Sequence, residues 1–335
     1  MRKRTLLKLA TVAAGGYIVA KRMLPPGYTY AGKVAIVTGG SRGLGLELAR
    51  NLVLSGAHVA ICARDEAELE VAREELEARG ADVYAAACDV TERSDVERFV
   101  GDVVSRFGRV DVLINNAGII AASPTECLTE DDYDRSLATH LYGPMYFIEA
   151  VLPHMKARRQ GRIANIASIG GKLSPPHILS YTAGKFALVG YSEGLGVELA
   201  KDGIRVTTVC PGLMRTGSMI NAEFKGQHRK EYGWFAAGAS IPVVTIDSTE
   251  AARRILDAVA RGRREYIFPI FWKIVVTGHE LFRDTSLAVM EQMNKLFPTP
   301  GGIGPESRLG RDSESAFTRS AFTQANREAA VRNNE

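Results

Sequence analysis

The chain has 335 residues, of which 46% are hydrophobic and 24% charged, and this ordinary globular balance excludes a collagen-like or wholly disordered chain. Its four cysteines (Cys62, Cys88, Cys127 and Cys210) form no Cys-x-x-Cys pair, which excludes a disulfide scaffold and argues against zinc and thioredoxin-type sites. Six basic and no acidic residues lie in residues 1–30, which leaves 36 basic against 38 acidic residues in the rest. A body so close to neutral argues against a nucleic-acid partner, and sparse thiols suit a reducing compartment.

Residues 1–30 are basic and weakly apolar. Arg2, Lys3 and Arg4 precede an apolar stretch at 9–20, which is shorter than the roughly 20 residues of a spanning helix. We favour a helix that lies on an anionic membrane surface. A signal peptide and a solvated or packed arm remain alternatives, although residues 18–20 make a poor cleavage site.

From residue 33, short apolar runs alternate with longer amphipathic stretches. The pattern predicts strands at 33–38, 57–62, 83–87, 110–114, 162–167 and 204–209. It predicts helices at 43–55, 66–79, 94–107, from 129 onward, and at 180–200. This alternation is typical of an α/β fold with a Rossmann-type, doubly wound parallel sheet that is covered on both faces.

The last part of the chain departs from this pattern. Residues 266–297 form a dense apolar patch followed by a helix, which either packs on the domain or on a second copy, or else covers the substrate or docks on a membrane. Residues 298–335 are polar and rich in Gly, Pro and Ser, and we expect a mostly disordered tail. The predicted organisation is therefore a segment at 1–30, a catalytic domain at 31–270, an extension at 271–297 and a tail at 298–335.

A glycine-rich loop joins the first predicted strand to the first predicted helix. Glycines in such a loop let the backbone approach a pyrophosphate, and the helix that follows offers its unpaired N–H groups. Its position favours a dinucleotide site over a structural turn. The loop contains Gly39, Ser41, Arg42, Gly43, Leu44 and Gly45.

The end of the second predicted strand indicates which dinucleotide is bound. An NAD site typically has an acidic residue there, which binds the ribose 2′-hydroxyl. In this sequence Ala63 occupies that position and Arg64 follows it. Together with Arg42, Arg64 can bind a 2′-phosphate, so we expect NADP. Asp65 keeps the NAD alternative open, because a shift of one residue would bring its carboxylate to the ribose.

Tyr181 and Lys185 lie four residues apart, so they share one face of a predicted helix. A lysine ammonium one turn away favours the phenolate and brings a tyrosine closer to useful acid–base range. Ser168 follows the fifth predicted strand, at the sheet edge where ligands bind, and can polarise a carbonyl group. Such a pair alone is also common as a packing tyrosine and a surface lysine, but its coincidence with Ser168 and the glycine loop favours catalysis.

With these motifs, the sequence resembles the short-chain dehydrogenase/reductase family over residues 33–268, and the loop spacing is similar to its short single-domain type. The matching motifs are the glycine loop, Asn115-Asn116-Ala117-Gly118, Ser168, the Tyr181/Lys185 pair, and Pro211-Gly212 followed by Thr216.

The resemblance implies a role for each motif. Tyr181 would be the general acid/base, Lys185 would bind the nicotinamide ribose, and Ser168 would orient the carbonyl. Other cofactor contacts are implied at Asp89 and Val90 for the adenine, at Asn116, Ala117 and Gly118 along the cofactor channel, and at Pro211, Gly212 and Thr216 for the carboxamide.

His140 departs from the family pattern. The family commonly has an asparagine at this position, which takes part in a water-linked proton relay largely through its backbone carbonyl. A histidine keeps that carbonyl and can itself carry protons, so the resemblance makes His140 a fourth catalytic candidate. A histidine that simply packs inside the helix layer is the alternative.

We therefore predict an NADP-dependent oxidoreductase that transfers a hydride between nicotinamide and a carbonyl or secondary alcohol. The alternatives are an NAD-dependent alcohol dehydrogenase working in the oxidative direction and a catalytically silent redox sensor. Apolar residues at 219–235 hint at a lipophilic substrate. We expect a cytoplasmic homo-oligomer with peripheral membrane contact and no metal.

Overall fold

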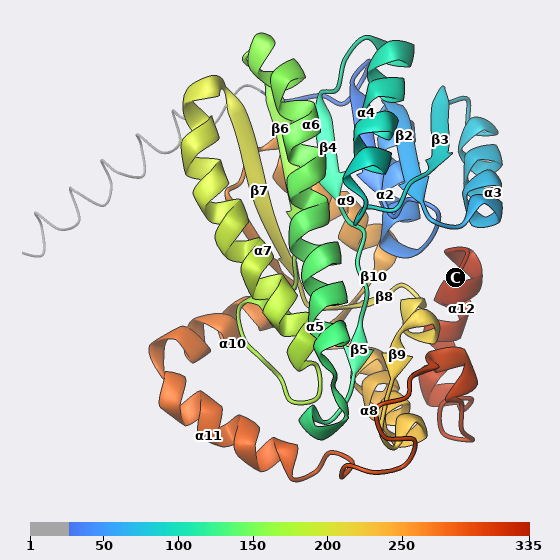
Figure 1. The fold of residues 1–335 in the computed structure, drawn as a ribbon, viewed down its shortest axis with the longest axis vertical. Helices are drawn as coiled ribbons and strands as arrows, with labels where there is room; N and C mark the ends of the chain where they lie inside the picture. Colours follow the sequence, from blue (N-terminus) through green and yellow to red (C-terminus); the bar gives the residue numbers. More distant parts are fainter. Residues whose placement is uncertain (1–26) are drawn as a thin grey trace, which may run out of the picture.

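The computed structural model describes residues 27–335 and is built around a seven-stranded sheet whose strands are all parallel (Figure 1). The order of the strands is β11-β7-β6-β4-β1-β2-β3. Their bounds are β1 (Val34–Thr38), β2 (His58–Ala63), β3 (Val83–Ala87), β4 (Val112–Asn115), β6 (Gly161–Ile166), β7 (Ile204–Pro211) and β11 (Glu265–Phe268). The predicted Rossmann-type sheet is confirmed.

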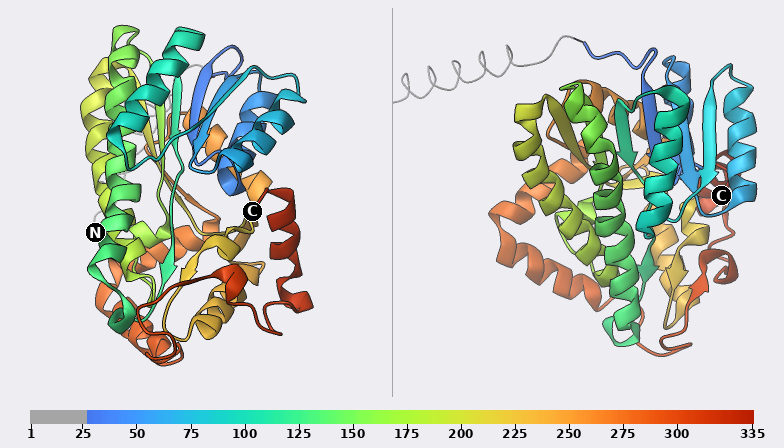
Figure 2. Two further views of the ribbon diagram at one scale, coloured as in Figure 1. Left: turned by 45° about the vertical axis from the view of Figure 1, so that its right-hand side comes forward. Right: turned by 45° about the horizontal axis from the view of Figure 1, so that its top comes forward.

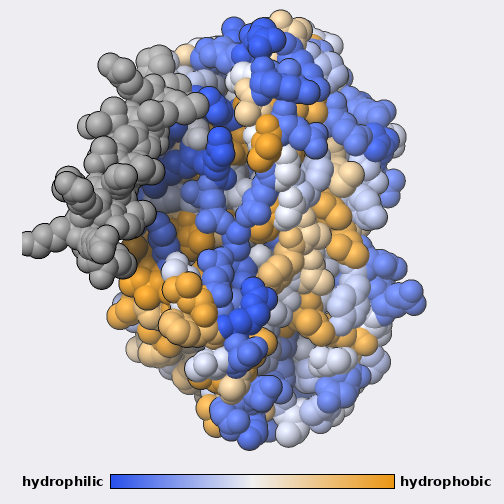
Figure 3. Space-filling view, turned by 90° about the vertical axis from the view of Figure 1, so that its left-hand side faces the viewer, coloured by the Kyte–Doolittle hydropathy of each residue, from blue (hydrophilic) through white to orange (hydrophobic). Residues whose placement is uncertain are grey.

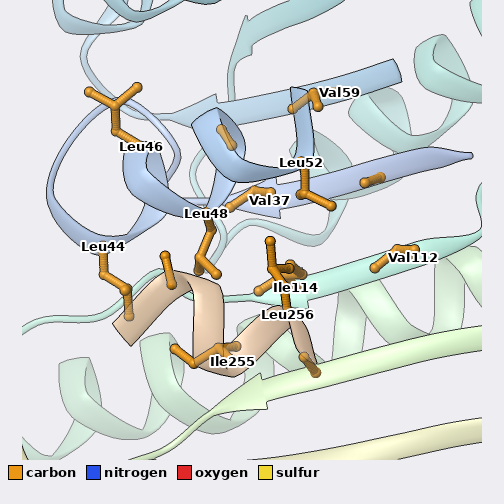
Figure 4. Packing of buried hydrophobic residues seen from close by; sticks show 14 of the residues in the cluster. Val37, Leu44, Leu46, Leu48, Leu52, Val59, Val112, Ile114, Ile255 and Leu256 are labelled. Atoms are coloured by element: carbon orange, nitrogen blue, oxygen red, sulfur yellow. The ribbon is translucent and has the colours of Figure 1, made fainter. Parts of the chain in front are cut away.

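Helices cover both faces of this sheet. One face carries α2 (Gly43–Leu54), α3 (Glu66–Glu77) and α9 (Ser248–Ala260). The other carries α4 (Arg93–Phe107), α6 (Gly143–Ala157) and α7 (Leu179–Glu198). Because successive strand residues point to opposite faces, β1 supplies Ala35 and Val37 to the first interior and Val34 and Ile36 to the second. Figure 4 shows the first interior, where Leu48 and Leu52 of α2 and Ile255 and Leu256 of α9 lie near Val37 and Ile114 of the sheet.

The chain reverses its direction of travel across the sheet at β1. It runs outward through β2 and β3 and then returns to place β4 on the other side of β1, where Ile36 pairs with both Ala60 and Leu113. The loops that follow β1 and β4 therefore lie side by side at the carboxyl edge. A ligand crevice in an open α/β sheet forms at such a reversal.

The long helix predicted from residue 129 is interrupted. Thr129 and Asp132 form a capping box at the start of α5 (Glu130–Leu137). A π-helical turn at Ala138–Tyr142 then separates α5 from α6. Such turns appear frequently at functional sites, and this one contains His140.

Smaller elements lie below the sheet in Figure 1. They are β5 (Ala121–Ala122), β9 (Glu223–Phe224) and β12 (Arg308–Leu309) in one sheet, β8 (Leu213–Arg215) and β10 (Thr245–Asp247) in another, and the helices α8 (His228–Ser240), α10 (Ile270–Leu281), α11 (Arg283–Asn294) and α12 (Gln324–Arg332).

The disordered tail predicted for 298–335 is not what the structure shows. Backbone hydrogen bonds join Gly226 to Ile303 and Gly304 at 3.0 Å, and α12 buries Ala329 and Ala330. The segment is too polar for a core of its own, which is why composition suggests disorder. It is ordered instead by hydrogen bonds to distant parts of the chain, which no local pattern reveals.

Most of the predicted segment at 1–30 lies outside the described residues, so its role stays a prediction. Among residues 27–335, no helix has the length and apolar character needed to cross a membrane.

Candidate active site

Tyr181 and Lys185 lie one turn apart on α7, close to its start. The Lys185 Nζ atom is 5.6 Å from the centre of the Tyr181 ring, so both side chains share one face. Lys185 is buried and donates a hydrogen bond to the Ile166 carbonyl of β6 at 2.9 Å. That bond fixes the ammonium group at the carboxyl end of the central sheet.

Ser168 follows β6 directly and caps a 3₁₀ turn at Ile169–Gly171. Its Oγ accepts a hydrogen bond from the Gly170 N–H at 3.0 Å. A Cβ placed on Gly170 would lie 3.0 Å from Tyr181 Cε1 and 3.4 Å from Ser168 Oγ. Gly170 therefore touches both side chains, and the structure brings the predicted serine, tyrosine and lysine into one site.

Burial dominates the acid–base properties of this site. It raises the pKa of Tyr181 to about 12, although a hydrogen bond with the Ser168 side chain opposes the rise. It lowers the pKa of Lys185 to about 7. The described environment thus does not produce the lowered tyrosine pKa expected from a neighbouring ammonium. Tyr181 holds its proton at neutral pH, as an acid that protonates a carbonyl must.

His140 packs edge-on against the Tyr181 ring, with ring centres 5.4 Å apart. Its Nε2 accepts a hydrogen bond from the Ile119 N–H at 3.2 Å. Its Nδ1 lies 3.2 Å from the Ser136 hydroxyl, which itself donates to the Ser180 carbonyl, so we infer that Nδ1 carries the hydrogen.

Burial, together with the charge of Lys185, holds the pKa of His140 well below its usual range. The ring is therefore neutral and uses both nitrogens. A proton relay through the imidazole would require one of these hydrogen bonds to open, so the geometry favours the packing alternative.

The glycine loop after β1 is held by the motif that follows β4. Thr38 Oγ1 accepts hydrogen bonds from the backbone N–H groups of Asn116 and Ala117 at 2.9 and 3.0 Å. The Asn116 side chain donates to the Thr38 and Gly39 carbonyls at 3.0 and 3.2 Å. A Cβ on Gly45 would collide with the Gly39 carbonyl oxygen, so this close approach requires glycine.

The start of α2 fits a dinucleotide pyrophosphate. Gly43 has a φ of +57°, and Arg42 at the N-cap places no side-chain hydrogen bond on the first turn. No side chain of the N-cap residue therefore caps that turn, and the helix dipole favours an anion there.

The end of β2 presents one arginine without a partner. Arg64 is exposed, and no ion pair joins it to the rest of residues 27–335. Asp65 turns back instead, and its Oδ1 accepts a hydrogen bond from the Glu68 N–H at 2.9 Å as the N-cap of α3. Arg42 Nη1 pairs with Glu68 at 2.6 Å. Binding of a 2′-phosphate by Arg42 would therefore compete with Glu68.

The remaining predicted cofactor residues also lie at loops that follow strands. Asp89 Oδ1 accepts two hydrogen bonds from Thr91 after β3. Val90 lies against Gly143, where an added Cβ would be 3.0 Å from the Val90 carbonyl oxygen. Pro211 ends β7. A Cβ on Gly212 would collide with the Trp272 indole, and a Cβ on Gly118 would lie 3.2 Å from His140 Nε2. Thr216 Oγ1 lies 2.7 Å from the Ser218 hydroxyl.

The cavity beside Tyr181 is small and is lined by both apolar and polar residues. Its volume of about 10 Å³ is at the lower limit for holding one water molecule. Its lining includes Asp132, which forms a buried ion pair with Lys225 at 2.5 Å. It also includes Arg135, which binds both carboxylate oxygens of Glu223.

The apolar residues expected to line the substrate site lie elsewhere. Met219 and Phe224 belong to a separate small interior with Tyr232. The Trp234 ring stacks on Phe297 with ring centres 5.1 Å apart. These side chains instead pack residues 219–235 onto the rest of the domain.

Sequence reasoning missed the residues at the end of the chain that contact the glycine loop. Asn333 and Glu335 contact the loop from the end of the chain, and Asn221 contacts Glu335. No motif or periodicity near residue 335 indicates this contact, because its partner groups lie nearly 300 positions away in the sequence.

Comparison with known proteins agrees with this geometry. A family model described as short chain dehydrogenase matches residues 33–226. A 3-oxoacyl-(acyl-carrier-protein) reductase of Staphylococcus epidermidis is 37% identical over 193 residues, which cover 57% of this chain and 78% of that protein.

Two solved structures show the same fold. A short-chain dehydrogenase from Streptomyces avermitilis superposes with a TM-score of 0.68 and 31% identity, covering 79% of this chain and 97% of the other. A variant of actinorhodin polyketide ketoreductase with NADPH superposes with a TM-score of 0.62 and 33% identity, covering 72% and 97%.

Proposed function

The chain belongs to the short-chain dehydrogenase family, and from that premise we propose that it is an NADPH-dependent carbonyl reductase. The family is one of oxidoreductases that act on CH–OH or C=O groups with NAD(P). The observation that carries the proposal is the convergence of Ser168, Tyr181 and Lys185 beside the glycine loop.

The three side chains divide the work of carbonyl reduction. When bound, NADPH supplies the hydride. The Ser168 hydroxyl donates a hydrogen bond to the substrate carbonyl and orients it, while Tyr181 Oη donates a proton to the same oxygen. Burial keeps that proton on Tyr181 until the oxygen becomes basic. Lys185, charged, would stabilise the phenolate that remains.

The His140 ring fits a positioning role. It is buried, neutral and edge-on to Tyr181, and it is locked at both nitrogens. It therefore limits the positions that the phenol ring can take. Its backbone carbonyl remains the group proposed for a water-linked relay.

NADPH is favoured over NADH by the groups at the end of β2. Arg64 is exposed and available for a 2′-phosphate, whereas the Asp65 carboxylate serves its own helix as an N-cap. The actinorhodin ketoreductase structure, which contains NADPH, supports the same choice.

The reaction is tested by following NADPH consumption by fluorescence. The substrates should include aliphatic ketones, aromatic ketones and a 3-oxoacyl thioester, the last because one relative is a 3-oxoacyl reductase. We expect turnover with at least one class and slower turnover with NADH. Turnover with NADH alone would contradict the cofactor assignment, and NADPH binding without turnover of any carbonyl would favour a redox sensor.

We further propose that the enzyme faces the cytoplasm and is held in part at a membrane. Besides the apolar stretch within residues 1–30, an exposed apolar surface is formed by α10 and α11, on the side of the molecule that Figure 3 shows. Ile270, Ile274, Leu281 and Phe282 are each 67–70% exposed there. Apolar side chains exposed in this way mark interaction surfaces, and the basic residues of 1–30 add attraction to anionic lipids.

Fractionation of lysate should recover the full-length protein partly with membranes. High salt should release only some of it, because screening removes the basic attraction but leaves apolar burial. Deletion of residues 1–26 should move the protein to the soluble fraction with its activity intact, since this deletion keeps Tyr30, which is buried and donates a hydrogen bond to the Leu256 carbonyl at 2.7 Å. A full-length protein that is entirely soluble at low salt would refute the proposal. The expected homo-oligomer stays a prediction.

A further inference from the structure

The last residues of the chain lie between the two walls of the proposed cofactor site. Figure 2 shows from two sides that the end of the chain, after α12, reaches the region of α2 and α3. One wall is the glycine loop at the start of α2. The other is the segment at 216–221 after β8, where a Cβ on Gly217 would collide with the backbone of Ala330.

Contacts with the glycine loop involve the groups that would hold phosphate. The Gly43 N–H donates a hydrogen bond to the Asn333 carbonyl at 2.9 Å. The Asn334 side chain donates to the Ser41 carbonyl at 3.0 Å. A Cβ on Gly43 would lie 2.5 Å from Glu335 Oε1, so the Glu335 carboxyl lies directly against the loop.

Residues 333–335 also form hydrogen bonds with the opposite wall, the segment at 216–221. The Asn221 side chain donates to Glu335 Oε2 at 2.7 Å, and the Asn333 side chain donates to the Thr216 carbonyl at 2.8 Å. Arg42 Nε lies 3.5 Å from Glu335 Oε2, and the Glu335 side chain is only 2% exposed. Residues 333–335 therefore bridge both walls.

A pyrophosphate at the start of α2 needs the Gly43 N–H and the space against Gly43, and the tail takes both. We propose that residues 333–335 act as an autoinhibitory plug, which occupies the phosphate-binding loop and must leave before NADPH can bind. The inference rests on the proposed function, because it requires a dinucleotide at this loop. The plug lowers the apparent affinity by the fraction of molecules in which the loop is open.

The charge at the plug adds a dependence on pH. Burial raises the pKa of Glu335 to about 7, against the pull of Arg42, while Glu68 raises it and Arg311 lowers it. A carboxyl group whose pKa is raised in the docked state favours docking when it is protonated. This contribution is complete below the usual value of 4.5 and is lost as the pH rises through about 7.

Equilibrium titration of the full-length protein with NADPH, followed by fluorescence, tests the plug. Replacing Glu335 with alanine, alone and together with Asn333→Ala, should lower the Kd for NADPH at least about fivefold, which corresponds to a loop open in roughly a fifth of wild-type molecules. Glu328→Ala is the matched control, because it removes a carboxylate from an exposed position on α12. It should leave the Kd unchanged.

Glu335→Gln mimics the protonated carboxyl group and should keep the plug docked at every pH. The ratio of the wild-type Kd to the Glu335→Gln Kd should therefore be near one at pH 6 and fall below one at pH 8. A ratio that stays the same across this range would contradict the proposed coupling to the proton.

Hydrogen exchange of residues 324–335 separates displacement from simple charge repulsion. Saturating NADPH should raise the exchange of this segment in the wild-type protein if the plug leaves. Unchanged or increased protection would overturn the inference, as would equal Kd values for the wild type and the alanine variants. If neither the wild type nor any variant binds NADPH or NADH, the proposed function fails and the inference fails with it.

Discussion

Replacing Tyr181 with phenylalanine is expected to lower kcat at least about 100-fold, the usual scale for loss of a general acid. The change removes only the hydroxyl group. The ring that packs against His140 and lies near Lys185 stays in place. The fold and the binding of NADPH should therefore survive, and the loss should fall on the chemical step. Steady-state kinetics with the best carbonyl substrate measures it.

Tyr191→Phe provides the matched control. Tyr191 is a partly buried tyrosine on the same helix, and it packs against the interior on the helix-covered face that includes α4 and α6. Loss of its hydroxyl should leave kcat almost unchanged. A Tyr181→Phe enzyme that turns over at nearly the wild-type rate, with an unchanged Kd for NADPH, would show that another group donates the proton.

Replacing Arg64 with alanine is expected to weaken NADPH binding about ten- to a hundredfold and to change NADH binding little. A charge-assisted hydrogen bond contributes roughly 1.5–3 kcal/mol, and only NADPH has a 2′-phosphate with which to form it. No ion pair within residues 27–335 is lost, because Arg64 is exposed and unpartnered there. Titration of each cofactor into both proteins gives the two ratios.

Arg261→Ala is a suitable control for this experiment. It removes an exposed arginine that pairs with Asp257 at the end of α9, so it changes the net charge by the same amount. It should affect NADPH and NADH equally and weakly. Equal losses of both cofactors in Arg64→Ala would instead assign Arg64 a structural role.

Local sequence patterns determined most of the sheet and its helices. Parallel strands that are buried on both faces read as short apolar runs, and the predicted run at 33–38 matches β1, whose five residues are all buried. The four-residue spacing of Tyr181 and Lys185 places them on one helical face whatever the rest of the fold does. The glycine loop is equally local, because the close approach of Gly45 to Gly39 leaves no room for a side chain.

Features that depend on distant partners could not be read from the sequence. Apolar spacing cannot distinguish a continuous helix after Thr129 from one broken by the π-helical turn at His140. The protonation states of Tyr181 and Lys185 could not be predicted from the sequence either. Burial has a larger effect on both pKa values than the spacing of the two residues.

The sequence by itself thus determined the strand–helix alternation, the family motifs and the catalytic candidates, since each depends on spacing within a few turns of chain. Only the tertiary structure decided where residues 298–335 lie and what they touch. That segment has too few apolar residues to fold alone, and its order comes from hydrogen bonds such as those of Asn333 with Gly43 and Thr216. Such bonds join residues that are far apart in the sequence and that only the tertiary structure brings together.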